Sequence, residues 1–261
     1  MNVAEPRPGL DNSFPKESTR PLADAARAPQ LALVVPALCE AANLQVLLER
    51  IRRSLDPVGI NYEVIIVDDD SRDGTDAIVK GIARQDARVR LLTRTGARGL
   101  AGAVIYGWQG TEAEILAVMD ADLQHPPELL PELWRELLSG ADIVVASRYA
   151  SHGSRPNWNR FRHLVSQLAI WMTLPLQKPG IRVKDPMSGF FLVRRNCIRE
   201  VTLQPQGFKI LLEILVRGNV HSASEVPFVF ASRHAGRSKA SLKVGLEYVA
   251  LLRRLWKTRR R

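Results

Sequence analysis

The sequence predicts a single α/β domain of Rossmann-like type, with a mostly parallel sheet flanked by helices. Two observations support this expectation. Short continuous runs of valine, isoleucine and leucine recur along the chain, and stretches with helical spacing of apolar residues lie between them. Runs of this kind are typical of strands buried on both faces, and their alternation with helices is typical of parallel sheets. Because no linker interrupts residues 31–235, we expect one domain.

The elements follow in a regular order. LALVV begins the first strand at residue 31, and the apolar residues of 44–55 then recur with the period of one helix face. Continuous apolar or β-branched runs give the remaining strands, and amphipathic spacing gives the helices. The expected strands are 31–35, 62–67, 89–92, 115–119, 142–147, 190–194 and 225–230. The expected helices are 44–55, 75–84, 100–109, 127–138, 161–177 and 209–217.

The two ends of the chain differ from this body. Residues 1–30 have no apolar core of the kind that a secretory signal needs, and we expect a disordered leader rich in Pro, Ala, Arg and Ser. The domain then covers 31–240, and 241–261 is expected to be a basic amphipathic helix. The longest apolar candidate for a membrane span, 168–176, is half the length that a span requires and contains Pro175. Cys39 and Cys197 have no metal-ligand spacing, and we expect them to be reduced.

The positive charge is concentrated in the C-terminal tail. The formal net charge of the chain is +10, and residues 233–261 hold ten basic residues against one acidic residue. The tail therefore carries +9, and the rest of the chain is nearly neutral. A basic tail attracts lipid headgroups, phosphorylated ligands or nucleic acid.

Aspartates follow two expected strands directly. Asp68, Asp69 and Asp70 come after YEVIIV, and such a cluster is costly unless hydrogen bonds or cations compensate its charge. Helix capping by Asp70 and Ser71, with a turn at residues 73–74, explains part of this segment. It leaves Asp68 and Asp69 unexplained, and ligands gather at the carboxyl ends of parallel strands. We therefore expect at least one of these two carboxylates to bind a ligand.

A second acidic pair, Asp120 and Asp122, follows the strand ILAVM. Residues two apart on an extended segment point the same way, so both carboxylates can face one cation or a cation-bound ligand. Gln124 stands two residues further on and can add a third oxygen. Oxygen ligands suit Mg²⁺ or Mn²⁺, which usually bring phosphates with them. A simple strand-to-helix turn is the alternative interpretation.

Taken in order, several motifs resemble glycosyltransferase family 2, and most closely the polyprenol-phosphate (dolichol-phosphate) mannose synthases. The resemblance extends over residues 31–239. The motifs are VVPALCEAANL, VDDDSRDGT, MDADLQHPPE, ASRY, DPMSGFF and GFKILLEIL. It implies a GT-A fold, a nucleotide-sugar donor (GDP-mannose in the nearest relatives), Mg²⁺ or Mn²⁺, and a polyprenol or dolichol monophosphate acceptor.

The resemblance also implies a set of site residues. The catalytic residues would be Asp120, Asp122 and Arg148, and the metal ligands Asp120, Asp122 and Gln124. The nucleotide and its diphosphate would contact Pro36, Leu38, Glu40, Val67, Asp69, Asp120, Ala121, Arg148, Arg233 and Lys239.

Four departures from the family pattern concern the donor side. Leu38 stands where an aromatic residue is usual, Cys39 where Asn is common, and Arg237 where Glu is usual. The loop 95–100 also lacks a lysine that many relatives place before its glycine. Another donor, such as UDP-glucose, or a non-catalytic nucleotide-sugar-binding subunit therefore remains an alternative.

The expected reaction needs no strong general base, because a phosphomonoester acceptor is already anionic. Direct in-line attack on an α-linked donor would invert the anomeric centre and give polyprenyl phosphate β-mannose. Asp185, in DPMSG, is either a partner on the acceptor side or a turn residue before Pro186.

A lipid acceptor requires contact with a bilayer, and two segments can supply it. These are 161–176, which is basic at its start, and 242–256, which has apolar residues along one side. We expect a peripheral enzyme on the cytoplasmic face of a membrane, with small membrane-spanning subunits as possible partners. A nucleic-acid-binding module would explain the tail alone and leave the aspartates unexplained, so we expect no nucleic acid partner.

Overall fold

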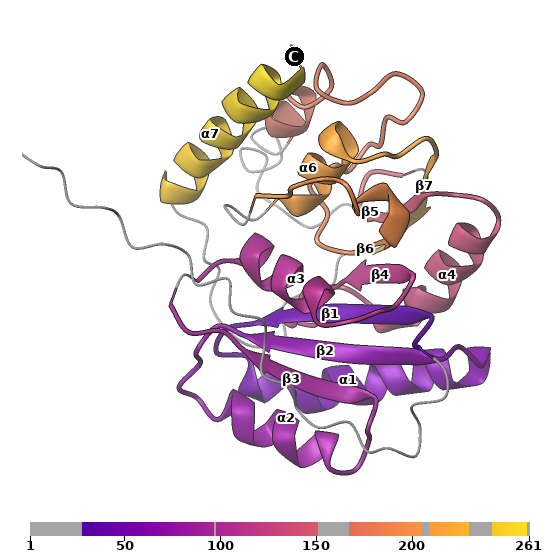
Figure 1. Ribbon diagram of the computed structural model, residues 1–261, viewed down its shortest axis with the longest axis vertical. Coiled ribbons are helices and arrows are strands. Elements are labelled where there is room, and N and C mark those ends of the chain that lie inside the picture. Colours follow the sequence, from indigo (N-terminus) through magenta and orange to yellow (C-terminus); the bar gives the residue numbers. More distant parts are fainter. Residues whose placement is uncertain (1–27, 97, 151–166, 205–208, 230–241, 260–261) are drawn as a thin grey trace, which may run out of the picture.

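The computed structural model describes residues 28–96, 98–150, 167–204, 209–229 and 242–259, and its centre is a seven-stranded sheet (Figure 1). The strand order is β3-β2-β1-β4-β6-β5-β7. The strands are β1 (Leu31–Ala37), β2 (Tyr62–Asp68), β3 (Val89–Thr93), β4 (Ile115–Val118), β5 (Ile143–Ser147), β6 (Phe191–Arg194) and β7 (Ala223–Pro227). All pairs are parallel except those of β6, which runs antiparallel to both β4 and β5. The predicted α/β class and mostly parallel sheet are confirmed.

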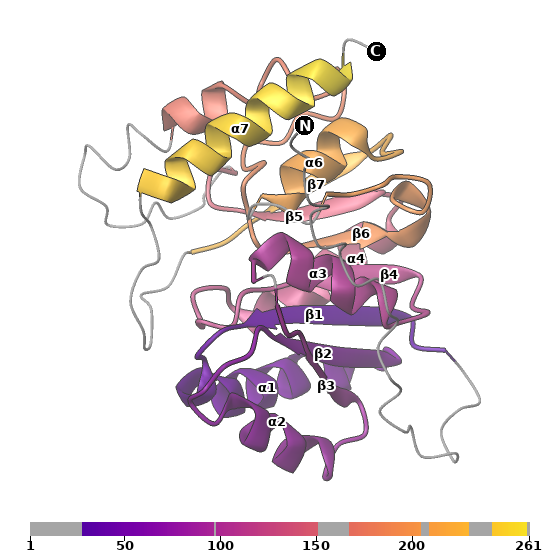
Figure 2. The same ribbon diagram turned by 60° about the vertical axis from the view of Figure 1, so that its left-hand side comes forward.

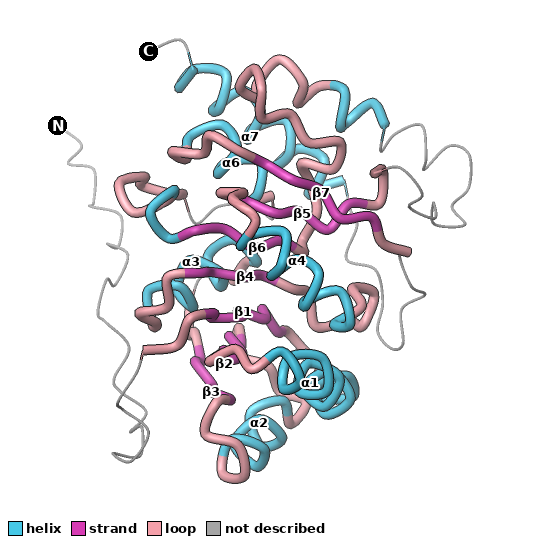
Figure 3. Tube along the Cα trace, turned by 90° about the vertical axis from the view of Figure 1, so that its right-hand side faces the viewer, coloured by secondary structure: helices cyan, strands magenta, loops and turns pink. Residues whose placement is uncertain are grey.

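Helices cover both faces of the sheet, as Figure 3 shows. One face packs against α1 (Ala41–Leu55), α2 (Thr75–Ala83) and α4 (Leu130–Leu138). The other packs against α3 (Leu100–Gln109) and α6 (Ile210–Arg217). Every residue of β2 is buried, which explains its continuous apolar sequence, because a strand covered on both sides needs apolar residues at both parities. Short 3₁₀ turns occupy Asp56–Val58, Pro127–Leu129 and Arg195–Cys197.

The last helix, α7 (Leu242–Arg259), lies at the end of the molecule farthest from β3 (Figure 2). Tyr248, Leu251 and Leu255 are buried against α6 and the segment 169–176. In the expected helix 161–177, residues 167–171 are helical and turns follow, while 161–166 lie outside the described residues. No helix in the described ranges is both long and apolar enough to cross a membrane. The expected leader also lies outside these ranges, apart from residues 28–30.

The expected late strand, 225–230, is shifted in the structure to Ala223–Pro227. Among the described strands it lies at the edge of the sheet and pairs with β5, over Ile143 to Ser147. The apolar run therefore marks the end of this strand rather than its centre.

Candidate active site

A pocket of 420 Å³ lies at the carboxyl ends of β1, β2 and β4. These strands are neighbours in the sheet, so the loops that follow them gather at one edge. The loop before α3 completes the wall. The lining residues are Pro36, Ala37, Leu38, Glu40, Asp69, Arg98, Gly99, Leu100, Asp120, Ala121 and Asp122.

The loop after β1 is held by side chains of the loop after β2. The backbone N–H of Cys39 donates to Ser71 Oγ at 2.8 Å, and that of Ala41 donates to Asp73 Oδ2 at 3.0 Å. Ser71 in turn donates to Asp68. Cys39 has φ of 59°, in the left-handed region. These bonds fix the backbone on either side of Leu38 and Glu40.

The three successive aspartates therefore have different structural roles. Asp68 closes the turn through Ser71, and Asp70 accepts from Arg98 Nη2 at 3.3 Å. The side-chain bonds at the start of α2 come from Asp73, which accepts from both the N–H and the hydroxyl of Thr75. The expected cap by Asp70 and Ser71 is therefore wrong, because Asp73 lies closer to the first turn of the helix. Asp69 is the one of the three that lines the pocket.

Asp69 is fixed by the loop before α3. Its Oδ2 accepts from the N–H of Gly99 at 2.8 Å, and Arg94 Nη1 lies 3.0 Å from its Oδ1. The arginine contact is an ion pair without hydrogen-bond geometry, since Oδ1 has no hydrogen-bond partner. Burial raises the pKa of Asp69. A Cβ at Gly102 would lie 2.8 Å from Arg94 Nη2, so the glycine makes room for this arginine.

Asp120 and Asp122 line the same pocket, as expected for residues two apart after a strand. Burial, and then the nearby charge of Asp122, raise the pKa of Asp120, which His125 partly opposes. A Cβ at Gly189 would lie only 2.8 Å from Asp120 Oδ2. Asp120 thus depends on a glycine of the DPMSG segment for its space.

His125 contacts the backbone of the segment that carries Asp120. Its Nδ1 accepts from the backbone N–H of Asp120 at 3.3 Å, and its ring lies against Phe190 and Phe228. Burial lowers the pKa of His125, and its Nδ1 also lies 3.6 Å from Asp120 Oδ2. His125 is thus a packing and backbone-positioning residue.

Cationic side chains lie on the β5 side of the site. Arg148 Nε and Nη2 donate to the two oxygens of Asp185 at 2.7 Å each, and its backbone N–H donates to Asp185 Oδ2 at 3.1 Å. Asp185 is completely buried, and its own N–H donates to Glu225 at 3.1 Å. The turn interpretation of Asp185 is confirmed, since its carbonyl accepts from the N–H of Ser188 at 3.2 Å, and its side chain also orients Arg148. A role of Asp185 on the acceptor side stays a prediction.

Lys209 is a residue of this region that the sequence reasoning did not identify. Its Nζ donates to the carbonyl of Met187 at 3.2 Å. Burial and the charge of Arg148 lower its pKa to about 8, while Asp120 and Asp185 act in the opposite direction. Lys209 and Arg148 thus bring positive charge to the side of the site opposite Asp69. The GFKILLEIL motif contained the signal, because Lys209 stands directly before a mainly apolar helix, and lysine is rarely buried without a specific partner.

Two of the expected site residues, Val67 and Gln124, do not line the pocket. Val67 is buried beneath α3, where its side chain approaches Gly107, and it does not line the pocket. Gln124 uses its backbone N–H to donate to Asp122 Oδ1 at 3.1 Å, and it is also absent from the lining. Arg233 and Lys239 lie outside the described residues, as does Arg237.

The pair Asp120 and Asp122 has the donor chemistry for Mg²⁺ or Mn²⁺. The described residues contain no group of three or more His, Cys, Asp or Glu side chains that could hold a metal ion. Two carboxylates are nevertheless sufficient for an ion that takes its other oxygens from phosphates and water. After the larger effect of burial, the charge of Asp122 also raises the pKa of Asp120, and a cation bound by both carboxylates would relieve this repulsion. These residues fit such an ion.

A sheet of this topology, with a carboxylate pair and a pocket at its carboxyl edge, defines the class of GT-A nucleotide-sugar transferases. The family model described as glycosyl transferase family 2 matches residues 32–202. The chain belongs to this family and is a glycosyltransferase.

Two curated relatives are similar to this chain over most of its length. A dolichol-phosphate mannosyltransferase from Pyrococcus furiosus is 41% identical over 229 residues, which cover 87% of this chain and 64% of the relative. One from Saccharomyces cerevisiae is 36% identical over 237 residues, 87% of each chain. This chain thus spans somewhat less than two thirds of the length of the archaeal relative.

Solved structures share the fold at lower identity. Glucosyl-3-phosphoglycerate synthase from Mycobacterium tuberculosis, in complex with phosphoglyceric acid, has a TM-score of 0.63 and 22% identity, covering 88% of this chain and 79% of that one. The same enzyme with Mn²⁺, UDP-glucose and phosphoglyceric acid has a TM-score of 0.61 and 20% identity, with the same coverage.

Proposed function

We propose that this enzyme transfers mannose from GDP-mannose to a dolichol or polyprenol monophosphate, with inversion at the anomeric carbon. The product would be polyprenyl phosphate β-mannose. One observation supports this most strongly: Asp120 and Asp122 lie together in a nucleotide-sized pocket of a chain whose curated relatives carry this activity in their names.

The pocket suits the donor in a definite orientation. Leu38 and Glu40 line it after β1, and we place the nucleobase and ribose there. Asp69, held by Gly99, continues this wall. Asp120 and Asp122 would hold Mg²⁺ or Mn²⁺, and Gln124 remains a candidate third ligand. The bound ion would stabilise charge on the departing nucleoside diphosphate.

The acceptor phosphate would approach from the β5 side. Arg148 is presented by a bidentate bond to Asp185, and this geometry limits the entropy that its side chain loses when a phosphate binds. Lys209 adds a second positive charge. Together these residues would draw an anionic phosphate oxygen toward the anomeric carbon, and such a nucleophile has no proton to lose. Arg233 and Lys239 would add charge on the diphosphate.

The direct test is transfer of labelled mannose from GDP-mannose to polyprenyl phosphate with Mn²⁺ present. Asp122→Asn should reduce turnover about a hundredfold or more, because it removes a carboxylate from the ion site. Asp76→Asn is the matched control, since Asp76 is an exposed aspartate on α2 that pairs with Lys80. Absence of transfer by the native enzyme, or equal turnover in Asp122→Asn, would contradict the proposal.

The choice of sugar and nucleotide needs its own experiment. Leu38 lines the pocket in place of the usual aromatic residue, which keeps UDP-glucose open as a second donor. A panel of GDP- and UDP-sugars against one polyprenyl phosphate decides this point, and NMR of the product gives the anomeric configuration. Turnover with a UDP-sugar alone would replace mannose in the proposal. Nucleotide binding without any transfer would indicate the non-catalytic subunit.

We also propose that the enzyme acts at the cytoplasmic face of a membrane. A polyprenol acceptor resides in a bilayer, and the basic C-terminal tail would be attracted by the anionic lipids of that face. Small membrane-spanning subunits are possible further partners. Cell fractionation of the tagged full-length chain, with and without a high-salt wash, tests peripheral association.

A further inference from the structure

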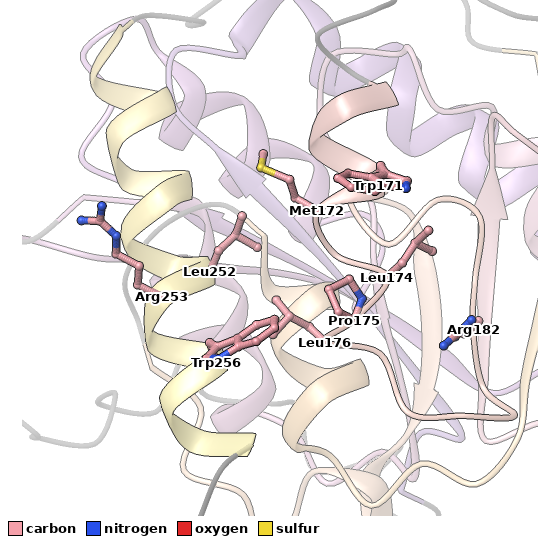
Figure 4. Close-up of a pocket in the computed structure, with 9 residues that line it drawn as sticks. All are labelled: Trp171, Met172, Leu174, Pro175, Leu176, Arg182, Leu252, Arg253 and Trp256. Carbon is pink, nitrogen blue, oxygen red and sulfur yellow. The ribbon is translucent and has the colours of Figure 1, made fainter.

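A second hollow, of 630 Å³, lies between α7 and the segment 171–176, and we call it the apolar trough (Figure 4). Leu252 and Trp256 project into it from α7, and they face the segment that carries Trp171 (Figure 4). The described lining residues are Trp171, Met172, Leu174, Pro175, Leu176, Arg182, Leu252, Arg253 and Trp256. The pocket that holds Asp120 and Asp122 shares none of these residues.

Exposed apolar side chains gather around the trough. Trp171 is 67% exposed and Trp256 is 43% exposed, whereas Trp108 and Trp134 are buried in the two sheet cores. Leu168, three residues before Trp171, and Val249, seven residues before Trp256 on α7, are also among the exposed large apolar side chains. Two exposed tryptophans at one apolar hollow are typical of an interaction site rather than of ordinary surface.

The charges at the trough have one sign. Arg182 and Arg253 lie at opposite sides of it (Figure 4), and the lining contains no acidic residue. The helix that forms one wall, α7, has Glu247 as its one acidic residue against five basic residues in its sequence. The complementary partner is therefore apolar at its centre and anionic at its surface.

The trough is held in shape by the enzyme itself. Tyr248, Leu251 and Leu255 anchor α7, and the Tyr248 hydroxyl donates to the carbonyl of Ala169 at 2.6 Å. Arg254 Nη1 donates to Gln204 Oε1 at 2.6 Å. The buried face of α7 thus belongs to the enzyme core, whereas Trp256 is 43% exposed.

The trough and the acceptor side of the active site are linked by one short loop. Met187 packs against the apolar cluster beneath the trough, and its carbonyl accepts from Lys209. Two residues later, Gly189 lies against Asp120. A lipid surface at the trough would therefore lie on the side of the molecule from which the acceptor phosphate is proposed to enter.

We infer that the apolar trough is the surface with which this enzyme docks on an anionic lipid bilayer, with hydrocarbon chains entering the trough and Arg182 and Arg253 contacting lipid phosphates. Indole rings favour the boundary between headgroups and hydrocarbon, where both tryptophans would lie. The charges favour lipid over a hydrophobic protein helix, which offers no ring of phosphates to the two arginines. The inference rests on the proposed lipid acceptor, but its test does not.

The test is flotation of the full-length chain with phosphatidylcholine vesicles, with and without phosphatidylglycerol. The native enzyme should bind the anionic vesicles and shift its tryptophan emission to the blue. Trp171→Ala and Trp256→Ala should each weaken binding about tenfold. Leu138→Ala is the matched control, because Leu138 is 59% exposed but lies on α4. All three side chains are exposed, and thermal unfolding should confirm that each variant folds.

The contribution of the two arginines to vesicle binding is tested with separate variants. Arg182→Glu combined with Arg253→Glu should weaken binding to anionic vesicles by about tenfold or more, and should also reduce its salt dependence. Arg53→Glu on α1, where the side chain is 73% exposed, should have little effect. Failure of the native chain to bind vesicles without another protein, or equal losses in Leu138→Ala and Arg53→Glu, would overturn the inference.

The two proposals can fail separately. Transfer to a short, water-soluble polyprenyl phosphate without vesicles should be unchanged in the trough variants, because they leave the active site intact. Vesicle binding that depends on the trough, without any sugar transfer, would refute the proposed reaction and support the docking surface. Transfer without trough-dependent vesicle binding would do the reverse.

Discussion

The two halves of the active site are stabilised by different means. On the donor half, the loops after β1, β2 and β4 are fixed by short polar side chains that bind backbone groups, such as Ser71 on Cys39 and Asp69 on Gly99. On the half that we propose receives the acceptor, a long cation, Arg148, is held by a completely buried carboxylate, Asp185. The donor half thus places its carboxylates through the backbone, whereas the acceptor half places cations through an ion pair. We therefore expect single substitutions in the donor half to weaken nucleotide-sugar binding in small steps. Loss of either partner of the Arg148–Asp185 ion pair should instead cause one large loss of stability.

The largest expected effect concerns Asp185. Asp185→Asn removes the charge that compensates Arg148 in a buried site, and we expect it to cost about 3 kcal/mol of unfolding free energy. Denaturant titration measures this loss. Asp142→Asn is a useful contrast, because the Asp142 carboxylate also accepts backbone N–H bonds, from His221 and Ser222, but forms no ion pair with an arginine among the described residues. Equal losses in the two variants would show that the ion pair itself contributes little.

The next largest effect is expected when the space beside Asp120 is filled. A Cβ in Gly189→Ala would come within 2.8 Å of Asp120 Oδ2 and displace the carboxylate, so we expect turnover to fall about a hundredfold. Gly81→Ala is the control, since no atom lies within 4 Å of the added Cβ and the glycine is in the interior of α2. That substitution should raise stability by about 0.5–1 kcal/mol and leave turnover unchanged. Full turnover in Gly189→Ala would disprove the steric argument.

A smaller effect is expected at the cation of the donor pocket. Arg98 lines the pocket together with four acidic residues and donates to the carbonyl of Asp70 at 2.9 Å. We expect it to contribute the charge that the loop 95–100 lacks relative to its family. Arg98→Ala should then weaken nucleotide-sugar binding about tenfold by calorimetry, and Arg98→Lys less. Arg72→Ala, an exposed residue of the loop after β2, should not change it.

The smallest effect concerns the backbone at Cys39. Its φ of 59° is unfavourable for cysteine and well tolerated by asparagine. Cys39→Asn should therefore raise the unfolding free energy by about 0.5 kcal/mol, because the N–H bond to Ser71 does not involve the side chain. Thermal unfolding measures this change, and a loss of stability would show that the thiol has a packing role.

The sequence predicted the alternation of strands and helices well, because each buried strand carries an uninterrupted apolar run. The strand-end positions predicted a ligand role for Asp120, Asp122 and at least one of Asp68 and Asp69. The family resemblance then selected Asp69, and Asp69, Asp120 and Asp122 all line one pocket. The direction of β6 could not be predicted in this way, because an apolar run is the same read from either end.

The position of Val67 along the strand, and not its parity, explains why it does not line the pocket. Val67 and Asp69 are two apart and share one face of the sheet, but α3 covers Val67 near Gly107, while Asp69 reaches the N–H of Gly99 just before that helix begins. The packing of Gly189 on Asp120 joins residues far apart in sequence. The spacing of residues in a sequence does not predict such long-range contacts, although the DPMSGFF motif, which contains Gly189, was part of the family resemblance.

The antiparallel direction of β6 has a consequence for how this enzyme can change its substrate. Because β6 runs opposite to β4 and β5, the loop that leads into it returns to the same edge of the sheet that the chain leaves after Ser147. One uninterrupted excursion, from Arg148 to Gly189, thus carries Arg148, Asp185, the first wall of the apolar trough and the glycine that makes room for Asp120. This segment can therefore be exchanged as one unit. Replacing it with the corresponding segment of a relative should change which acceptor the enzyme uses, while most of the nucleotide pocket stays in place.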